Sequence, residues 1–125
     1  MSFIDSVTSQ LISKALDISV LKHDVIANNI ANVNSENYKA FKIDFDAQME
    51  QLKNIAHSDI TKEEKISMLK DLDFTSDKIA SETDIKVVLD DELVALNKNV
   101  TNYQALLSAK KNYGSIMTMA IRGGK

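Results

Sequence analysis

Apolar residues recur at every third or fourth position between residues 4 and 30 of the chain. A main seam is interrupted only by Lys14, and a second apolar stripe runs beside it. The seam consists of Ile4, Val7, Leu11, Ile18, Leu21 and Val25, and the second stripe of Ile12, Ala15, Ile26 and Ile30. This spacing, sustained over several heptads, favours a helix that packs in a coiled coil. It predicts a long helix within residues 1–36.

The same spacing returns near the C-terminal end and predicts a second long helix over residues 89–125. Acidic residues fill its first turn and basic residues lie at its end, as the helix dipole favours. Gly123 and Gly124 are suited to end it. Its seam comprises Leu89, Leu93, Leu96, Val100, Tyr103, Leu107, Met117 and Ile121, with Lys110 and Gly114 as interruptions.

The middle of the chain, residues 37–88, has weaker patterns. Tyr38, Phe41, Ile43 and Phe45 lie among polar residues with a period near two, which indicates an extended segment. The run Thr61–Glu64 fits a capping box, with Thr61 as N-cap and Glu64 reaching back, ahead of a short amphipathic helix. Residues 73–88 are polar and predict little regular structure before Ile85.

These patterns together predict a mainly α fold. Two long terminal helices pack as an antiparallel coiled coil, and a short, partly extended or loosely structured segment connects them. Residues 1–36, 37–88 and 89–125 are its three parts within one structural domain. Because such a hairpin has a thin core and wide apolar stripes, we expect other chains to complete its apolar faces. Periodicity alone leaves open that the stripes serve only the chain's own core.

Composition narrows the class of protein. The chain has 125 residues, a formal net charge of −3, three glycines, and no proline, cysteine or tryptophan. Few turn-forming residues favour helices over a β-rich domain. The acidic balance argues against a nucleic-acid binder. We expect no transmembrane helix and no cleavable signal peptide, because no apolar run has the length or flanks that these need.

Candidate chemistry is sparse. His23 and His57 have no matched partners at metal-ligand spacing, and no serine has the context of a nucleophile. The run Asp71–Asp77 with Glu82 echoes a calcium-binding loop, but Ser76 stands where such a loop needs glycine. We therefore expect no enzyme activity, no cofactor and no metal site. A calcium-binding module stays a rival hypothesis.

Two runs at opposite ends of the chain resemble the bacterial flagellar rod and hook family. The first run consists of Ala27, Asn28, Asn29, Ile30, Ala31 and Asn32, followed by Tyr38-Lys39-Ala40 and then Asp44 and Phe45. The second consists of Tyr103-Gln104-Ala105-Leu106-Leu107, Lys110-Lys111 and Ala120-Ile121-Arg122-Gly123-Gly124, and is similar to the proximal-rod type of that family. Gln104 belongs to the part that separates this type from other rod proteins.

The resemblance implies a structural subunit of the flagellar basal-body rod. It implies export through the flagellar type III apparatus without a cleaved signal, followed by helical assembly in the periplasm. The implied partners are copies of the chain, adjacent rod proteins, the rod adapter protein at the export gate and the membrane-supramembrane ring. The implied export signal is Phe3, Ile4 and Val7. The rival reading is a helical adaptor or export chaperone that stays in the cytosol.

The asparagines near residue 30 qualify the assembly hypothesis. Asn28 and Asn32 continue the seam as polar positions that would fix register, and Asn29 points elsewhere. Where the family has Thr-Pro-Gly, this chain has Ser35-Glu36-Asn37, and Asn37 tolerates a positive φ. The predicted assembly interface is therefore Ile4, Val7, Leu11, Ile18, Leu21, Val25, Asn28, Asn29, Asn32, Leu93, Leu96, Val100, Tyr103, Leu107, Met117 and Ile121.

Overall fold

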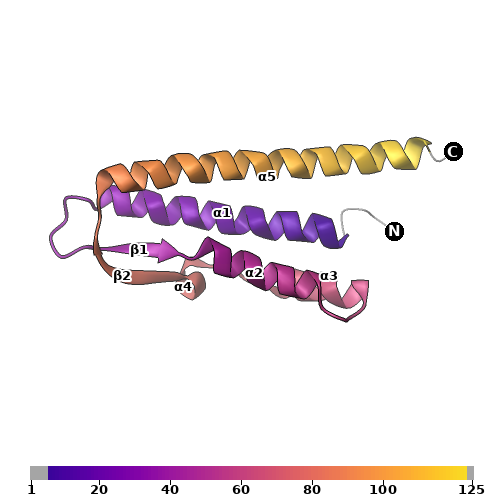
Figure 1. The fold of residues 1–125 in the computed structure, drawn as a ribbon, viewed down its shortest axis with the longest axis horizontal. Coiled ribbons are helices and arrows are strands. Elements are labelled where there is room, and N and C mark those ends of the chain that lie inside the picture. Colours follow the sequence, from indigo (N-terminus) through magenta and orange to yellow (C-terminus); the bar gives the residue numbers. More distant parts are fainter. Residues whose placement is uncertain (1–5, 124–125) are drawn as a thin grey trace.

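Two long antiparallel helices lie side by side, and the C-terminal one is the longer. A computed structural model describes residues 6–123 and, within them, the side chains of all but residues 76–77 and 114–123. In this structure α1 (Val7–Ala31) lies beside α5 (Leu89–Gly123) (Figure 1). Ser6 caps α1, since its hydroxyl accepts a hydrogen bond from the Ser9 N–H at 3.1 Å. The predicted mainly α fold is confirmed, and α1 ends earlier than residue 36. None of the described helices combines the length and apolar run that crossing a bilayer requires.

The middle segment is more regular than the sequence patterns indicated. It forms β1 (Lys39–Ile43), α2 (Phe45–Ala56), α3 (Lys62–Asp71), α4 (Ser76–Ile79) and β2 (Ala80–Lys86). The extended stretch before residue 44 and the helix after Thr61 are confirmed. The Thr61 hydroxyl accepts from the Glu64 N–H at 3.1 Å. The expectation of weak structure over residues 73–88 is wrong, and α2 was not predicted.

The two strands are far apart in sequence, and their pairing brings the beginning and the end of the middle segment together. They pair antiparallel, with Phe41 opposite Glu82 and Ile43 opposite Ala80, and the register is irregular between Lys39 and Phe41. The Thr83 hydroxyl donates to the Ala40 carbonyl at 2.8 Å. This pairing brings the start of α5 back to the end of α1, from which α5 runs antiparallel along α1 (Figure 1).

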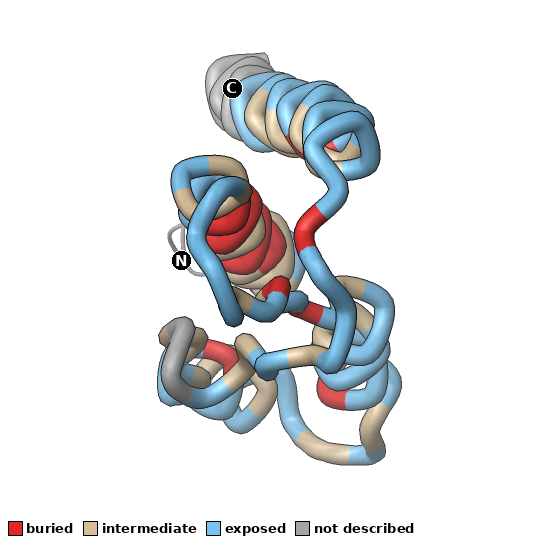
Figure 2. Tube along the Cα trace, turned by 90° about the vertical axis from the view of Figure 1, so that its left-hand side faces the viewer, coloured by how far each residue is buried: buried red, intermediate tan, exposed pale blue. Residues whose placement is uncertain are grey.

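The main core lies between α1 and the middle segment rather than between the two long helices. Its buried members come from α1, β1, α2 and α3; they are Ala15, Ile18, Val25, Ile43, Leu52, Ile55 and Leu69. Figure 2 shows the same distribution, with buried positions along α1 and the described part of α5 almost entirely exposed or intermediate. The expectation of a thin two-helix core is therefore wrong, because α1 is covered on two sides.

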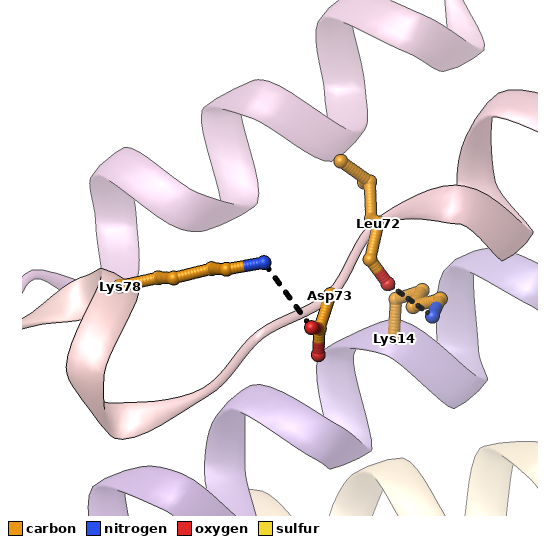
Figure 3. Close-up of polar contacts among 4 residues, drawn as sticks. All are labelled: Lys14, Leu72, Asp73 and Lys78. Carbon is orange, nitrogen blue, oxygen red and sulfur yellow. Dashed lines mark hydrogen bonds and ion pairs between the residues drawn. The ribbon is translucent and has the colours of Figure 1, made fainter.

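Lys14, the polar exception in the α1 seam, has a specific role in this layer. Its Nζ donates to the Leu72 carbonyl at 2.7 Å, directly after the end of α3 (Figure 3). A lysine there satisfies a carbonyl that the helix leaves free and complements the negative end of its dipole. The seam is thus directed at the middle segment, and the lysine belongs to that contact.

Candidate assembly interface

The contact between α1 and α5 is centred on polar side chains. Ser19 is completely buried and Asn99 is 2% exposed. The Ser19 hydroxyl donates to the Asn99 Oδ1 at 3.2 Å, and the Asn99 Nδ2 donates to the Ser19 carbonyl at 2.8 Å. Farther along, the Tyr113 hydroxyl donates to the Ser6 Oγ at 2.8 Å. Among the α5 side chains that the structure describes, Asn99 alone is buried.

The predicted apolar seam of α5 does not face α1 squarely. In a helix, consecutive residues point about 100° apart, so Val100 points about 100° and Leu93 about 120° away from Asn99, on the same side. Leu93 is 43% exposed and Val100 is 37% exposed. Leu96, Tyr103 and Leu107 are intermediate, as expected for the edge of the contact. The intramolecular seam of α5 is therefore displaced from the predicted one, and the apolar stripe lies at its edge.

This displaced stripe forms one wall of an apolar groove of about 400 Å³ between the two long helices. Val20 on α1, which is 46% exposed, faces the groove from the other wall. The groove is lined by Ser19, Val20, His23, Asn99, Val100, Tyr103, Gln104 and Leu107. It thus unites residues of the predicted interface with the family-motif residue Gln104. Further exposed apolar side chains, Ile85, Val88, Leu89, Leu93 and Val94, lie at the start of α5 and just before it.

The predicted seam of α1 is used inside the chain. Ile18 and Val25 are buried in the main core, and Val7, Leu11 and Leu21 pack against it. The expected antiparallel packing of α1 on α5 is confirmed. The main seam of α1, however, faces α2, α3 and β1 rather than the α5 seam. Ile18 is completely buried and Val25 is 8% exposed, so a role of these two residues between chains stays a prediction.

Asn29 connects three segments at the end of α1. It is 1% exposed. Its Nδ2 donates to the Phe41 carbonyl at 2.9 Å and to the Glu92 Oε2 at 3.3 Å. Its Oδ1 accepts from the Phe41 N–H at 2.9 Å and from the Tyr38 hydroxyl at 3.1 Å. Within the chain the side chain therefore joins α1 to β1 and α5, and its contact with a neighbouring chain stays a prediction.

The neighbouring asparagines are more accessible. Asn28 is exposed and donates to the Tyr38 hydroxyl at 2.9 Å. Asn32 caps the end of α1, and its Nδ2 donates to the Asn28 carbonyl at 2.8 Å. Asn37 has φ 63°, which confirms that it takes the positive φ for which the family has glycine. This left-handed residue lies in the turn before β1.

The remaining motif residues have local roles. Asp44 caps α2, because its Oδ1 accepts from the Ala47 N–H at 3.0 Å. Phe45 packs against the core, and the Lys22 Nζ lies 5.5 Å from its ring centroid. Ala27 and Ala31 are exposed and Ile30 is intermediate. Phe3 and Ile4 lie outside the described residues, and Met117 and Ile121 lie on α5 where side chains are not described.

In the acidic segment that resembled a calcium-binding loop, Lys78 and Asp73 form an ion pair at the surface. The Lys78 Nζ lies 3.2 Å from the Asp73 Oδ2, with both side chains more than half exposed (Figure 3). Among the side chains that the structure describes, which exclude that of Asp77, no group of three His, Asp or Glu lies close enough to hold a metal ion. His23 lines the apolar groove and His57 caps the end of α2.

Sequence reasoning missed Ser19 and Asn99. Both are polar and neither belongs to a motif. Ser19 interrupts the second apolar stripe of α1, and Asn99 falls beside the apolar seam of α5. The sequence does show that Asn99 lies seven residues after Glu92 and seven before Leu106, so the three share one face of the helix. Ser19 likewise lies seven residues from Ile12 and from Ile26 on the same helical face.

Comparisons with known proteins agree on one family. A family model described as flagella basal body rod protein matches residues 21–39, which hold the asparagine-rich end of α1 and its turn. The chain is 30% identical over 124 residues to the flagellar basal body rod protein FlgB of Bacillus subtilis, covering 94% of this chain and 95% of that protein. No solved structure matches. This identity extends over nearly both full lengths, so the chain belongs to the flagellar basal body rod proteins, as a member of FlgB type, and it is a structural component rather than an enzyme.

Proposed function

We propose that this chain is a subunit of the proximal rod, and that it assembles helically with copies of itself and with adjacent rod proteins. In this proposal the apolar stripe of α5 is the contact surface. The observation that carries it is the exposure of that stripe: Leu93 and Val100 are 43% and 37% exposed although they belong to a regular apolar seam. A seam that the chain does not use for its own core is available to a neighbour.

The geometry of the groove supports a helix as the occupant. Val20 and Val100 flank an apolar channel between two antiparallel helices, and a third helix fits such a channel with side chains spaced three or four residues apart. Completing the burial of a half-exposed Leu or Val contributes about 1 kcal/mol. Several such contacts, repeated by a head-to-tail arrangement that does not close, generate a helical array.

The proposal includes the route and the place of assembly. The chain is exported by the flagellar type III apparatus without a cleaved signal and joins the periplasmic rod above the export gate. Its further partners are the rod adapter protein and the membrane-supramembrane ring. Phe3, Ile4 and Val7 act as the export signal. The double variant Phe3→Asp/Ile4→Asp should block secretion while the intracellular level of the chain is unchanged, and normal secretion would contradict this part.

A matched pair of variants on α5 tests the contact surface. Val100→Asp places a charge in the stripe, whereas Asn102→Asp places one at an exposed position on the other side of Asn99. We expect Val100→Asp to remove the chain from purified basal bodies and to stop swimming, and Asn102→Asp to leave both normal. Urea unfolding of the isolated variants controls for folding. Equal incorporation of the two variants contradicts the contact surface, and recovery of the unmodified chain only in the cytosol with a client contradicts the rod assignment.

A further inference from the structure

Helix α5 is docked on α1 in a rotation that its apolar residues alone would not select. The side chain nearest the contact line is Asn99, while the apolar stripe through Leu93 and Val100 is turned toward the surface. A rotation of α5 about its own axis by about 70°, which is less than the angle of about 100° between consecutive residues, would centre that stripe on α1. Something in the contact must therefore favour the observed rotation.

The polar contacts between the two helices supply that preference. Both ends of the Asn99 amide are used, since Oδ1 accepts from the Ser19 hydroxyl and Nδ2 donates to the Ser19 carbonyl. Glu92, one heptad earlier on the same face of α5, accepts from Asn29 at 3.3 Å. A roll of α5 would break these bonds together, because both residues leave the contact line in the same direction. Movement of α5 along its own axis is more restricted than rotation, because only two residues, Val87 and Val88, connect it to β2.

We propose that the buried Ser19–Asn99 pair, supported by the Asn29–Glu92 contact, sets the rotation of α5 about its own axis and thereby keeps its apolar stripe exposed. Ser19 and Asn99 are in this sense positioning residues. They form the floor of the groove, and Val20 and Val100 form its walls. The consequence for assembly rests on the proposed function: the same pair presents the stripe to a second copy of the chain.

The absence of cysteine from the sequence makes a thiol-labelling test clean. Cysteine is introduced singly at Val100→Cys or at Asn102→Cys, each with and without the double change Ser19→Ala/Asn99→Ala, and alkylation by a maleimide is timed on the full chain. Without the polar pair α5 should roll toward its apolar stripe. The labelling rate at position 100 should then fall by about threefold or more, because a thiol reacts only where reagent reaches it, while the rate at position 102 does not fall.

A swapped pair provides the matched rescue. Ser19→Asn/Asn99→Ser keeps an amide and a hydroxyl at the two positions, and it should restore the original ratio of the two labelling rates. An unchanged ratio in the alanine background overturns the proposal. So does a joint rise of both rates, which would mean that the pair only attaches α5. The labelling uses the isolated chain, so it decides this inference whether or not Val100→Asp blocks assembly.

Discussion

Replacement of Asn29 by alanine should be one of the most damaging single changes outside the apolar core. The Asn29 side chain is almost completely buried and makes four hydrogen bonds, two of them to the backbone of Phe41. In Asn29→Ala the Phe41 N–H and carbonyl lose their side-chain partner in a partly buried contact. An unsatisfied buried backbone group costs about 1–3 kcal/mol, so we expect the free energy of unfolding to fall by about 2–4 kcal/mol.

Asn28→Ala is the matched control for that change. Asn28 is the adjacent residue of the same type, but it is exposed and its bond to the Tyr38 hydroxyl can be replaced by water. Its loss should cost about 0.5 kcal/mol. Urea unfolding followed by circular dichroism should therefore show a midpoint lowered by about 1–2 M for Asn29→Ala and little shift for Asn28→Ala. Equal midpoints for the two variants would refute the view that Asn29 joins α1 to β1 and α5.

Four further changes test other parts of the fold by the same unfolding measurement. Leu52→Ala should cost about 2–5 kcal/mol because the side chain is 1% exposed in the core; a loss below 1 kcal/mol would place the core elsewhere. Asp44→Ala should cost about 1 kcal/mol by removing the α2 cap, whereas Asp46→Ala should cost less. Asn37→Ala should cost about 1 kcal/mol and Asn37→Gly almost nothing, since the residue has a positive φ; the opposite order would show that the turn is different. Lys78→Ala should change stability by less than about 0.5 kcal/mol, because its ion pair with Asp73 is exposed, and a larger loss would mean that the loop depends on it.

The two terminal helices could be predicted from the sequence because their periodicity is long and regular. The start of α3 was equally readable, since Thr61 carries the signal that caps a helix. The strand before Asp44 followed from alternation. In each of these cases a local pattern and the final fold favour the same structure.

The middle segment was harder because its signals overlap or arise from distant contacts. Phe45 fits the period-two series that ends β1 and also opens the series Phe45, Met49, Leu52 of α2, and the first pattern concealed the second. Strand β2 is mostly polar and exposed, and only pairing with β1 fixes it as a strand. Its assignment therefore required a partner about forty residues away, as the pairing of Phe41 with Glu82 shows.

The sequence identified the residues of the α5 apolar seam but not the direction in which that seam faces. Periodicity identified Val100 and Leu107 as seam residues, and it placed that seam against α1. It gave no weight to Ser19 or Asn99, whose hydrogen bonds determine which face of α5 is buried. The spacing of hydrophobic residues shows how apolar each face of α5 is. Which face packs on α1 depends in addition on the hydrogen-bonded pair Ser19 and Asn99, which spacing does not reveal.

The proposed assembly depends on burial of the α5 apolar stripe between subunits of the rod. This burial can be observed by electron cryomicroscopy of basal bodies that contain this chain, at a resolution that shows side chains. We expect Val20, Leu93 and Val100 to lie against a helix of a neighbouring subunit, with Ser19 and Asn99 still paired within the chain. A rod in which that stripe faces solvent, while neighbouring subunits meet through other surfaces, would contradict it.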